Sequence, residues 1–92
     1  MRSSPEVTDD IGLKVALAGR INEVILLRGL SQSEAAAEVG TSQPKISQIR
    51  RYKLNNISVG RLLQALVALG QRIDIVISPA GERTSPAVRV AA

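Results

Sequence analysis

The sequence predicts a mainly α-helical domain of four short helices followed by a β-strand. Through residues 11–70, apolar residues recur at spacings of three and four, which is the period of an amphipathic helix. Over residues 72–78 the spacing changes to two, which is the period of a strand. The chain has 92 residues, 45% of them apolar, enough for one domain with a modest core. Dimerisation would add to the stability of a domain this small.

The first two helices are predicted over Ile11–Arg28 and Ser31–Val39. In the second, Ser31 and Glu34 form the S-x-x-E pattern, in which each side chain satisfies a free backbone N–H of the first turn. Glycine follows each helix and supplies the positive φ that a tight turn favours. The first helix should bury a stripe of five aliphatic residues, namely Leu13, Leu17, Ile21, Val24 and Leu27.

The third helix is predicted from Gln43 to about Tyr52, and the fourth from Ser58 to Gly70. Ser42 caps the third helix, and Pro44 falls in its first turn, where a missing N–H costs little. The third helix has only two strongly apolar residues, Ile46 and Ile49, three apart on one side. The fourth has a wider inner stripe, formed by Leu62, Leu66 and Leu69 with Val59 and Leu63 beside them.

A strand is predicted over residues 72–78, where Ile73, Ile75 and Ile77 alternate with other residues. A lone strand leaves unpaired backbone groups, so it needs a partner. It either pairs with its copy in a dimer, forms a hairpin with residues 87–90, or receives another protein by strand addition. We favour the dimer. The predicted organisation is a flexible tail over 1–10, a domain over 11–78 and a second flexible tail over 79–92.

Charge is segregated along the chain, whose net charge is +4. Residues 39–73 carry six basic residues and no acid, whereas residues 1–38 carry more acids than bases. A basic stretch of this kind suits a polyanion. The only aromatic residue is Tyr52, which argues against stacking on single-stranded nucleic acid. Double-stranded DNA stays a candidate, because its grooves are read by amide, hydroxyl and guanidinium groups.

The composition argues against an enzyme. The chain contains no His and no Cys, which excludes a Ser–His nucleophile, a thiolate and a histidine metal ligand. No glycine-rich nucleotide loop is present, and we expect no cofactor or metal. The start of the sequence lacks the apolar core of a signal peptide, and no run is long enough to span a membrane. We therefore expect a cytoplasmic protein.

The most informative stretch is residues 31–53, SQSEAAAEVGTSQPKISQIRRYK. Two short helices, separated by a turn of three to four residues that contains Gly, are the physical description of a helix-turn-helix. The second of them turns its polar side away from the two isoleucines. On that side Gln43 or Gln48 can pair with adenine and Arg51 with guanine. Phosphate contacts suit Lys45, Arg50 and Lys53.

This stretch resembles the Xre/Cro-type helix-turn-helix regulators, whose four- or five-helix, lambda-repressor-like domain sits on operator DNA. The resemblance covers about residues 13–70. It is strongest at Leu30-Ser31-Gln32, at Ala36-x-x-Val39-Gly40 and at Ser42-Gln43-x-x-Ile46-Ser47. It implies a phosphate contact for Gln32 and base contacts early in the third helix, at Gln43, Pro44, Lys45 and Gln48. Pro44 offers only apolar contact, as with a thymine methyl. Tyr52-Lys53 stands where many relatives have Gly-Lys.

A narrower resemblance is to HigA-type antitoxins, which repress their own operon and are encoded beside a toxin. It rests on Leu62-Leu63-x-x-Leu66-x-x-Leu69-Gly70 and the strand that follows. It implies a homodimer on a palindromic operator and a toxin protein as a further partner. The alternative function is a protein-interaction module that neutralises a partner with little DNA binding. The residues expected to read bases are Gln43, Pro44, Ser47, Gln48 and Arg51, and those expected at a dimer interface are Leu66, Ile73, Ile75 and Ile77.

Overall fold

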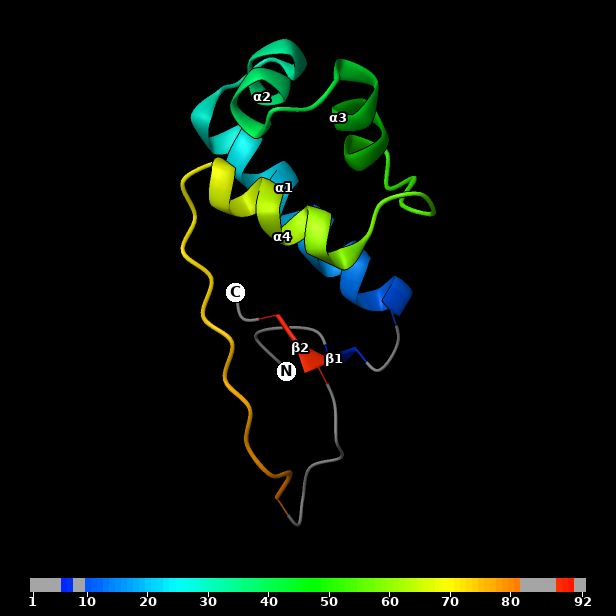
Figure 1. The fold of residues 1–92 in the computed structure, drawn as a ribbon, viewed down its shortest axis with the longest axis vertical. Helices are drawn as coiled ribbons and strands as arrows, with labels where there is room; N and C mark the ends of the chain where they lie inside the picture. The colour runs from blue at the N-terminus through cyan, green and yellow to red at the C-terminus, as the bar shows by residue number, and fades with distance from the viewer. Residues whose placement is uncertain (1–5, 8–9, 82–87, 91–92) are drawn as a thin grey trace.

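The computed structural model describes residues 6–7, 10–81 and 88–90 (Figure 1). The four predicted helices are present, as α1 (Asp10–Arg28), α2 (Gln32–Val39), α3 (Gln43–Arg50) and α4 (Val59–Ala68). The helices α1 and α4 run side by side, and α2 and α3 lie together across one side of that pair (Figure 1). This arrangement confirms the predicted mainly α-helical fold.

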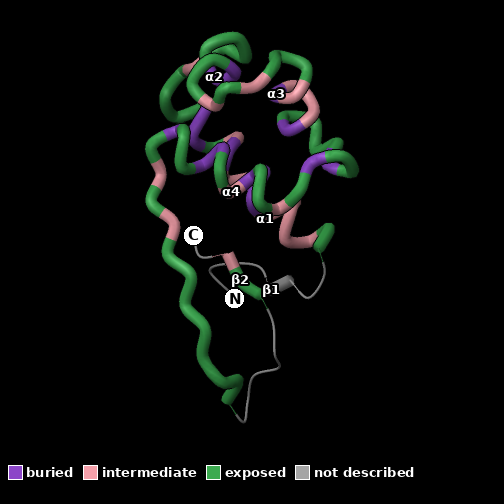
Figure 2. Tube along the Cα trace, viewed as in Figure 1, coloured by how far each residue is buried: buried purple, intermediate pink, exposed green. Residues whose placement is uncertain are grey.

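The core lies where the four helices meet, and Figure 2 shows its buried residues on their inner sides. One predicted core residue is wrong, because Leu27 is 79% exposed. Ile25 takes its place and is 1% exposed. The inward direction of α1 passes through Ile21 and between Val24 and Ile25, so Leu27 lies beyond its edge. The largest fully buried side chains are Ile21, Ile25, Ile46, Leu62 and Leu69.

Arg28 joins the ends of three helices. Its two terminal nitrogens donate to the two carboxylate oxygens of Glu38, on α2, at 2.6 and 2.7 Å. Its Nη1 also donates to the carbonyl oxygen of Leu69, which ends α4, at 3.4 Å. The bond from Arg28 lowers the pKa of Glu38 and raises the pKa of the guanidinium. A forked contact of this kind fixes orientation as well as distance.

The strand predicted over residues 72–78 is not formed in this single chain. The segment from Gln71 to Gly81 runs away from the helices as an extended, largely exposed chain (Figures 1 and 2). Ile75 and Ile77 are 74% and 91% exposed. A strand is defined by hydrogen bonds to a neighbour, and residues 72–78 pair with no strand in the described part of the chain. The predicted hairpin with residues 87–90 is not formed by the described residues 88–90, because Val88 and Arg89 pair with β1 instead, and Ala87 lies outside the described residues.

Two short strands form instead, in segments that were predicted to be tails. The strand β1 (Glu6–Val7) pairs antiparallel with β2 (Val88–Arg89), so that Glu6 lies opposite Arg89 and Val7 opposite Val88. This two-stranded sheet lies near the start of α1 (Figure 1). Parts of both predicted tails therefore take part in the fold. The rest of the tail predictions, at 1–5, 8–9, 82–87 and 91–92, lie outside the described residues.

Candidate nucleic-acid interface

Both ends of α2 are formed by local hydrogen bonds, at the capping box that the sequence predicts and at the turn that leads to α3. The Glu34 N–H donates to Ser31 Oγ at 3.0 Å, and the Ser31 N–H donates to Glu34 Oε1 at 2.8 Å. These bonds confirm the capping box and lower the pKa of Glu34. Gly40, at φ 77°, ends α2, and its N–H and that of Thr41 both donate to the Ala36 carbonyl at 2.9 Å. The angle between the two helices is thus fixed by backbone contacts.

The helix α3 turns its polar side to solvent. Its start is fixed by Ser42, whose Oγ accepts the Lys45 N–H at 3.3 Å. Ile46 and Ile49 face inward and are 0% and 4% exposed. On the opposite side Gln43, Pro44 and Arg51 are exposed and Ser47 is half-buried. An uncovered polar face on the second helix of such a motif is available to enter a groove of DNA.

The side chain of Gln48 is less exposed than the sequence predicts. The residue is half-buried, and its Oε1 is buried without a hydrogen-bond partner in the described part of the chain. Bidentate pairing with adenine needs both the oxygen and the nitrogen of the amide. In this conformation Gln48 therefore cannot present the full pattern, and its side chain has to rotate outward to do so. Gln43, by contrast, is exposed in the first turn.

The helix α3 ends two residues before the predicted end, because Tyr52 adopts a left-handed conformation with φ 57°. The Lys53 N–H donates to the Gln48 carbonyl at 2.8 Å, and the Tyr52 N–H donates to the Ile49 carbonyl at 3.2 Å. These are the two bonds of a Schellman motif. Glycine is the usual residue at such a position, so Tyr52 preserves the geometry that a Gly-Lys exit would give.

The basic residues fall into two groups. Four cations outside the motif are paired with acids, namely Lys14 with Asp10, Arg20 with Glu23, Arg28 with Glu38 and Arg72 with Asp74. The cations between residues 45 and 61 form no ion pair with any described residue. Their charge is therefore not neutralised within the described chain. This unpaired group consists of Lys45, Arg50, Arg51, Lys53 and Arg61.

Two of these cations line one hollow between α3 and α4. The hollow has a volume of about 290 Å³, and its lining includes Lys45, Arg61, Thr41, Asn56 and Gln64, with no acidic residue among them. Arg61 is not among the residues that the sequence predicts at the site. Its place in the basic stretch was a signal, but only the fold brings it beside Lys45.

The remaining predicted phosphate contacts are accessible. Gln32 is the first residue of α2 and is exposed. Arg50 and Lys53 are exposed at the other end of the motif, on either side of the α3 exit. Gln32 and Gln43 are the first residues of α2 and α3, and the positive end of a helix dipole favours an anion.

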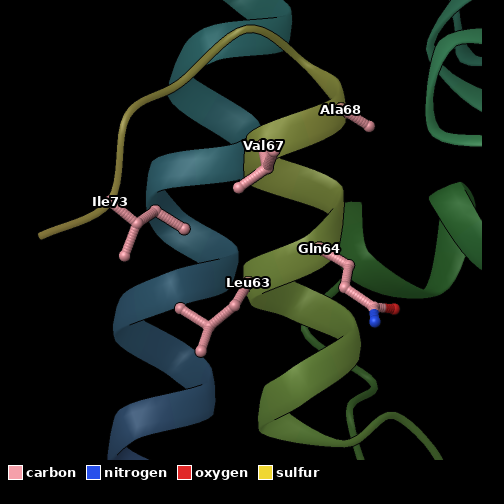
Figure 3. A pocket seen from close by; sticks show the side chains of 5 residues that line it. All are labelled: Leu63, Gln64, Val67, Ala68 and Ile73. Atoms are coloured by element: carbon pink, nitrogen blue, oxygen red, sulfur yellow. The ribbon is translucent and has the colours of Figure 1, made fainter. Parts of the chain in front are cut away.

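The predicted dimer residues separate into two kinds. Leu66 is 5% exposed and belongs to the core between α4 and α1 in the single chain. Ile73 is half-buried and lines an apolar groove of about 430 Å³ with Leu63 and Val67, and the three side chains point into the same gap (Figure 3). Ile75 and Ile77 lie farther along the extended segment, free of the core.

Comparison with known proteins now identifies the fold. A family model described as a helix-turn-helix domain matches residues 3–78. The chain belongs to this helix-turn-helix family. A solved structure of a protein described as an XRE family transcriptional regulator shares 42% of its sequence with this chain, at a TM-score of 0.79. The match covers 90% of this chain and 92% of that one. No curated protein matches.

The XRE-type assignment confirms the resemblance drawn from residues 30–47, and it agrees with the expectation that the chain is a DNA-binding regulator and not an enzyme. Among the described residues, no helix is long and apolar enough to cross a membrane. The same residues contain no cluster of three or more side chains suited to holding a metal ion.

Proposed function

We propose that this XRE-type protein is a sequence-specific transcriptional repressor that inserts α3 into the major groove of double-stranded DNA. The observation that carries the proposal is the exposed polar side of α3 together with the unpaired cations around it. A helix of this length fits the major groove, and cations without acidic partners are free to neutralise phosphates. Occupancy of an operator by such a domain blocks transcription.

Each side chain of the interface has a distinct part in this proposal. Gln43 reads adenine and Arg51 reads guanine, with apolar contact from Pro44 and a hydroxyl from Ser47. Gln48 adds a contact after its amide rotates outward. The phosphate contacts come from Gln32, Lys45, Arg50 and Lys53, to which the shared hollow adds Arg61.

We further propose that the repressor is a homodimer on a palindromic operator. The segment 72–78 has β-branched residues, free backbone groups and two isoleucines at 74% and 91% exposure. Pairing with the same segment of a second copy would satisfy the backbone and bury those side chains. Burial of each isoleucine contributes about 1.5–3 kcal/mol. Two α3 helices would then lie about one helical turn apart on the DNA, roughly 34–36 Å.

The test is selection of duplexes from a random pool by the full chain, followed by titration of a fluorescent selected duplex and a scrambled one. The selected duplex is expected to bind at least 10³-fold more tightly, as specific sites generally do. Arg51→Ala should reduce that ratio. Arg20→Ala, which removes the same charge from a cation paired with Glu23 on α1, is the matched control. Failure to enrich any sequence would contradict the proposal.

One observation favours a second partner. The exposed, unpaired edge of residues 72–78 is a surface to which another protein can add a strand. If the partner is a toxin encoded in a neighbouring gene, the protein is the antitoxin of an autoregulated operon. Alternatively, neutralising that partner is the main function and DNA binding is weak. Co-expression with the adjacent reading frames tests for the partner, because only a protein that neutralises a toxin restores growth and co-purifies with it. Binding of the purified complex to the selected duplex then separates the two cases, because only the autoregulating antitoxin binds DNA tightly.

A further inference from the structure

Asn22 connects α1 to the end of α3. Its Nδ2 donates to the carbonyl oxygen of Ile49 at 3.2 Å, across 27 residues of sequence. The same carbonyl accepts the Tyr52 N–H at 3.2 Å. The Ile49 oxygen is thus shared between the turn that ends α3 and a side chain from a different helix. A contact from outside the motif therefore reaches the point where α3 stops.

The Tyr52 side chain lies near the same face of α1. A Cβ added to Gly19 would lie 3.7 Å from the Tyr52 hydroxyl, so the glycine leaves room beside this side chain. Gly19 and Asn22 are three residues apart and share one face of α1. That face is therefore turned toward the exit of α3, and Asn22 makes the hydrogen bond to it.

Arg51 lies between Ile49, whose carbonyl accepts the Asn22 bond, and Tyr52, whose N–H donates to that same carbonyl. It caps α3 with φ −101° and ψ 6°, and its N–H donates to the carbonyls of Ser47 and Gln48 at 3.1 and 3.2 Å. The direction in which the Arg51 side chain leaves the backbone therefore depends on the turn that the Asn22 bond supports. Reading of a base pair requires this kind of preorganisation.

We infer that Asn22 is a positioning residue for DNA recognition, and that its hydrogen bond to Ile49 sets which base pair Arg51 reaches. This inference rests on the proposed base contact of Arg51. Asn22 Oδ1 is buried and has no partner among the described residues. Since half of the buried amide is unsatisfied, Asn22 adds little net stability. Its main effect is on geometry.

The variant Asn22→Leu tests this role. Leucine has a similar volume and removes both the donor and the unsatisfied oxygen, so the folded state should persist. The Tyr52 and Lys53 amides should exchange hydrogen faster than in the parent chain. The ratio of affinities for selected and scrambled duplexes should fall between about two- and thirtyfold, with little change on the scrambled duplex. Glu23→Gln, an exposed neighbour facing away from α3, should change neither measurement.

A double-mutant cycle separates this inference from the proposed function. In an Arg51→Ala background, Asn22→Leu should have no further effect on the affinity ratio. An equal loss on both duplexes, or an undiminished effect without Arg51, would overturn the inference. If Arg51→Ala alone leaves the ratio unchanged, the proposed base contact fails, while the amide exchange still tests the contact of Asn22. If the leucine variant does not fold, the same measurements are made on Asn22→Gln, which keeps the amide.

Discussion

Arg28 holds Glu38 through both terminal nitrogens of its guanidinium, at 2.6 and 2.7 Å, and so joins the end of α1 to α2. This contact lowers the pKa of Glu38 below its ordinary value of 4.5, and the capping box lowers that of Glu34. Both carboxylates lie in the helix that precedes α3. The first expectation is therefore an acid sensitivity of this part of the fold.

Stability should fall as the pH drops below 4.5. Above that value both carboxyl groups are ionised in the folded and unfolded states, and their contribution is fully present. Below it, the unfolded chain takes up protons first, because the folded pKa values are lower. Thermal unfolding from pH 7 to pH 3 measures the effect. Glu34→Gln keeps the capping hydrogen bond and should lose less stability than the parent chain between pH 7 and pH 3. If Glu34→Gln and Glu38→Gln both lose as much stability as the parent chain, these two carboxyl groups are not the cause.

The left-handed conformation of Tyr52 predicts an unusual order of stability among variants. Tyr52→Gly and Tyr52→Ala both remove the ring, but only glycine accepts φ 57° without strain. The glycine variant should therefore be about 1–2 kcal/mol more stable than the alanine variant. Chemical denaturation measures the difference. An alanine variant equal to or more stable than the glycine variant would show that the turn changes its conformation.

The hollow shared by Lys45 and Arg61 predicts a change in salt dependence. Arg61→Gln should weaken binding to all duplexes alike and reduce the slope of log affinity against log salt by about 0.9 if it contacts one phosphate. Lys45→Gln should do the same. Arg20→Gln, whose parent residue pairs with Glu23 on α1, serves as the control for lost charge. Titration at four or more salt concentrations gives the slopes, and a parental slope in Arg61→Gln excludes a phosphate contact there.

The two glutamines of α3 should differ in importance. Gln43 is exposed, whereas the Oε1 of Gln48 is buried. Gln43→Ala should cost about 1–3 kcal/mol at one base pair of the operator, and Gln48→Ala should cost less. Binding to a set of duplexes with single substitutions measures both effects. A larger, position-specific loss for Gln48→Ala would mean that this side chain rotates outward on DNA.

The exposed isoleucines of residues 72–78 lead to a prediction about dimerisation. Ile75→Lys and Ile77→Lys should shift the chain toward monomers and weaken binding to a palindromic operator more than binding to a half-site. Ser78→Lys adds the same charge on the other face of the segment and should leave the dimer intact. Sedimentation velocity over a range of concentrations measures the association. A monomeric parent chain at all concentrations would remove the basis for the dimer.

The helices could be predicted because their signals are local. Ser31 and Ser42 were expected as caps, and each side chain accepts a backbone N–H of the first turn, from Glu34 and Lys45 respectively. The polar outward side of α3 followed from two isoleucines three residues apart. Such features depend on neighbours a few residues away, which the sequence displays directly.

The errors concern contacts between distant parts of the chain. The pairing of Glu6–Val7 with Val88–Arg89 involves two residues on each side, too few to show a period. Leu27 was misjudged because the packing of α1 against the other helices sets its inward direction, which passes between Val24 and Ile25. The hollow of Lys45 and Arg61, and the bond from Asn22 to Ile49, exist only after the helices are packed.

The pairing of β1 with β2 brings two segments from opposite ends of the chain into register beside α1. A covalent link across those ends, with new termini opened among residues 74–81, would give a circular permutant in which the four helices keep their order. Such a rearrangement would interrupt the exposed segment while leaving α2 and α3 untouched. Under the proposed function, operator reading and self-association would then be separable by topology alone, without altering any side chain of α3.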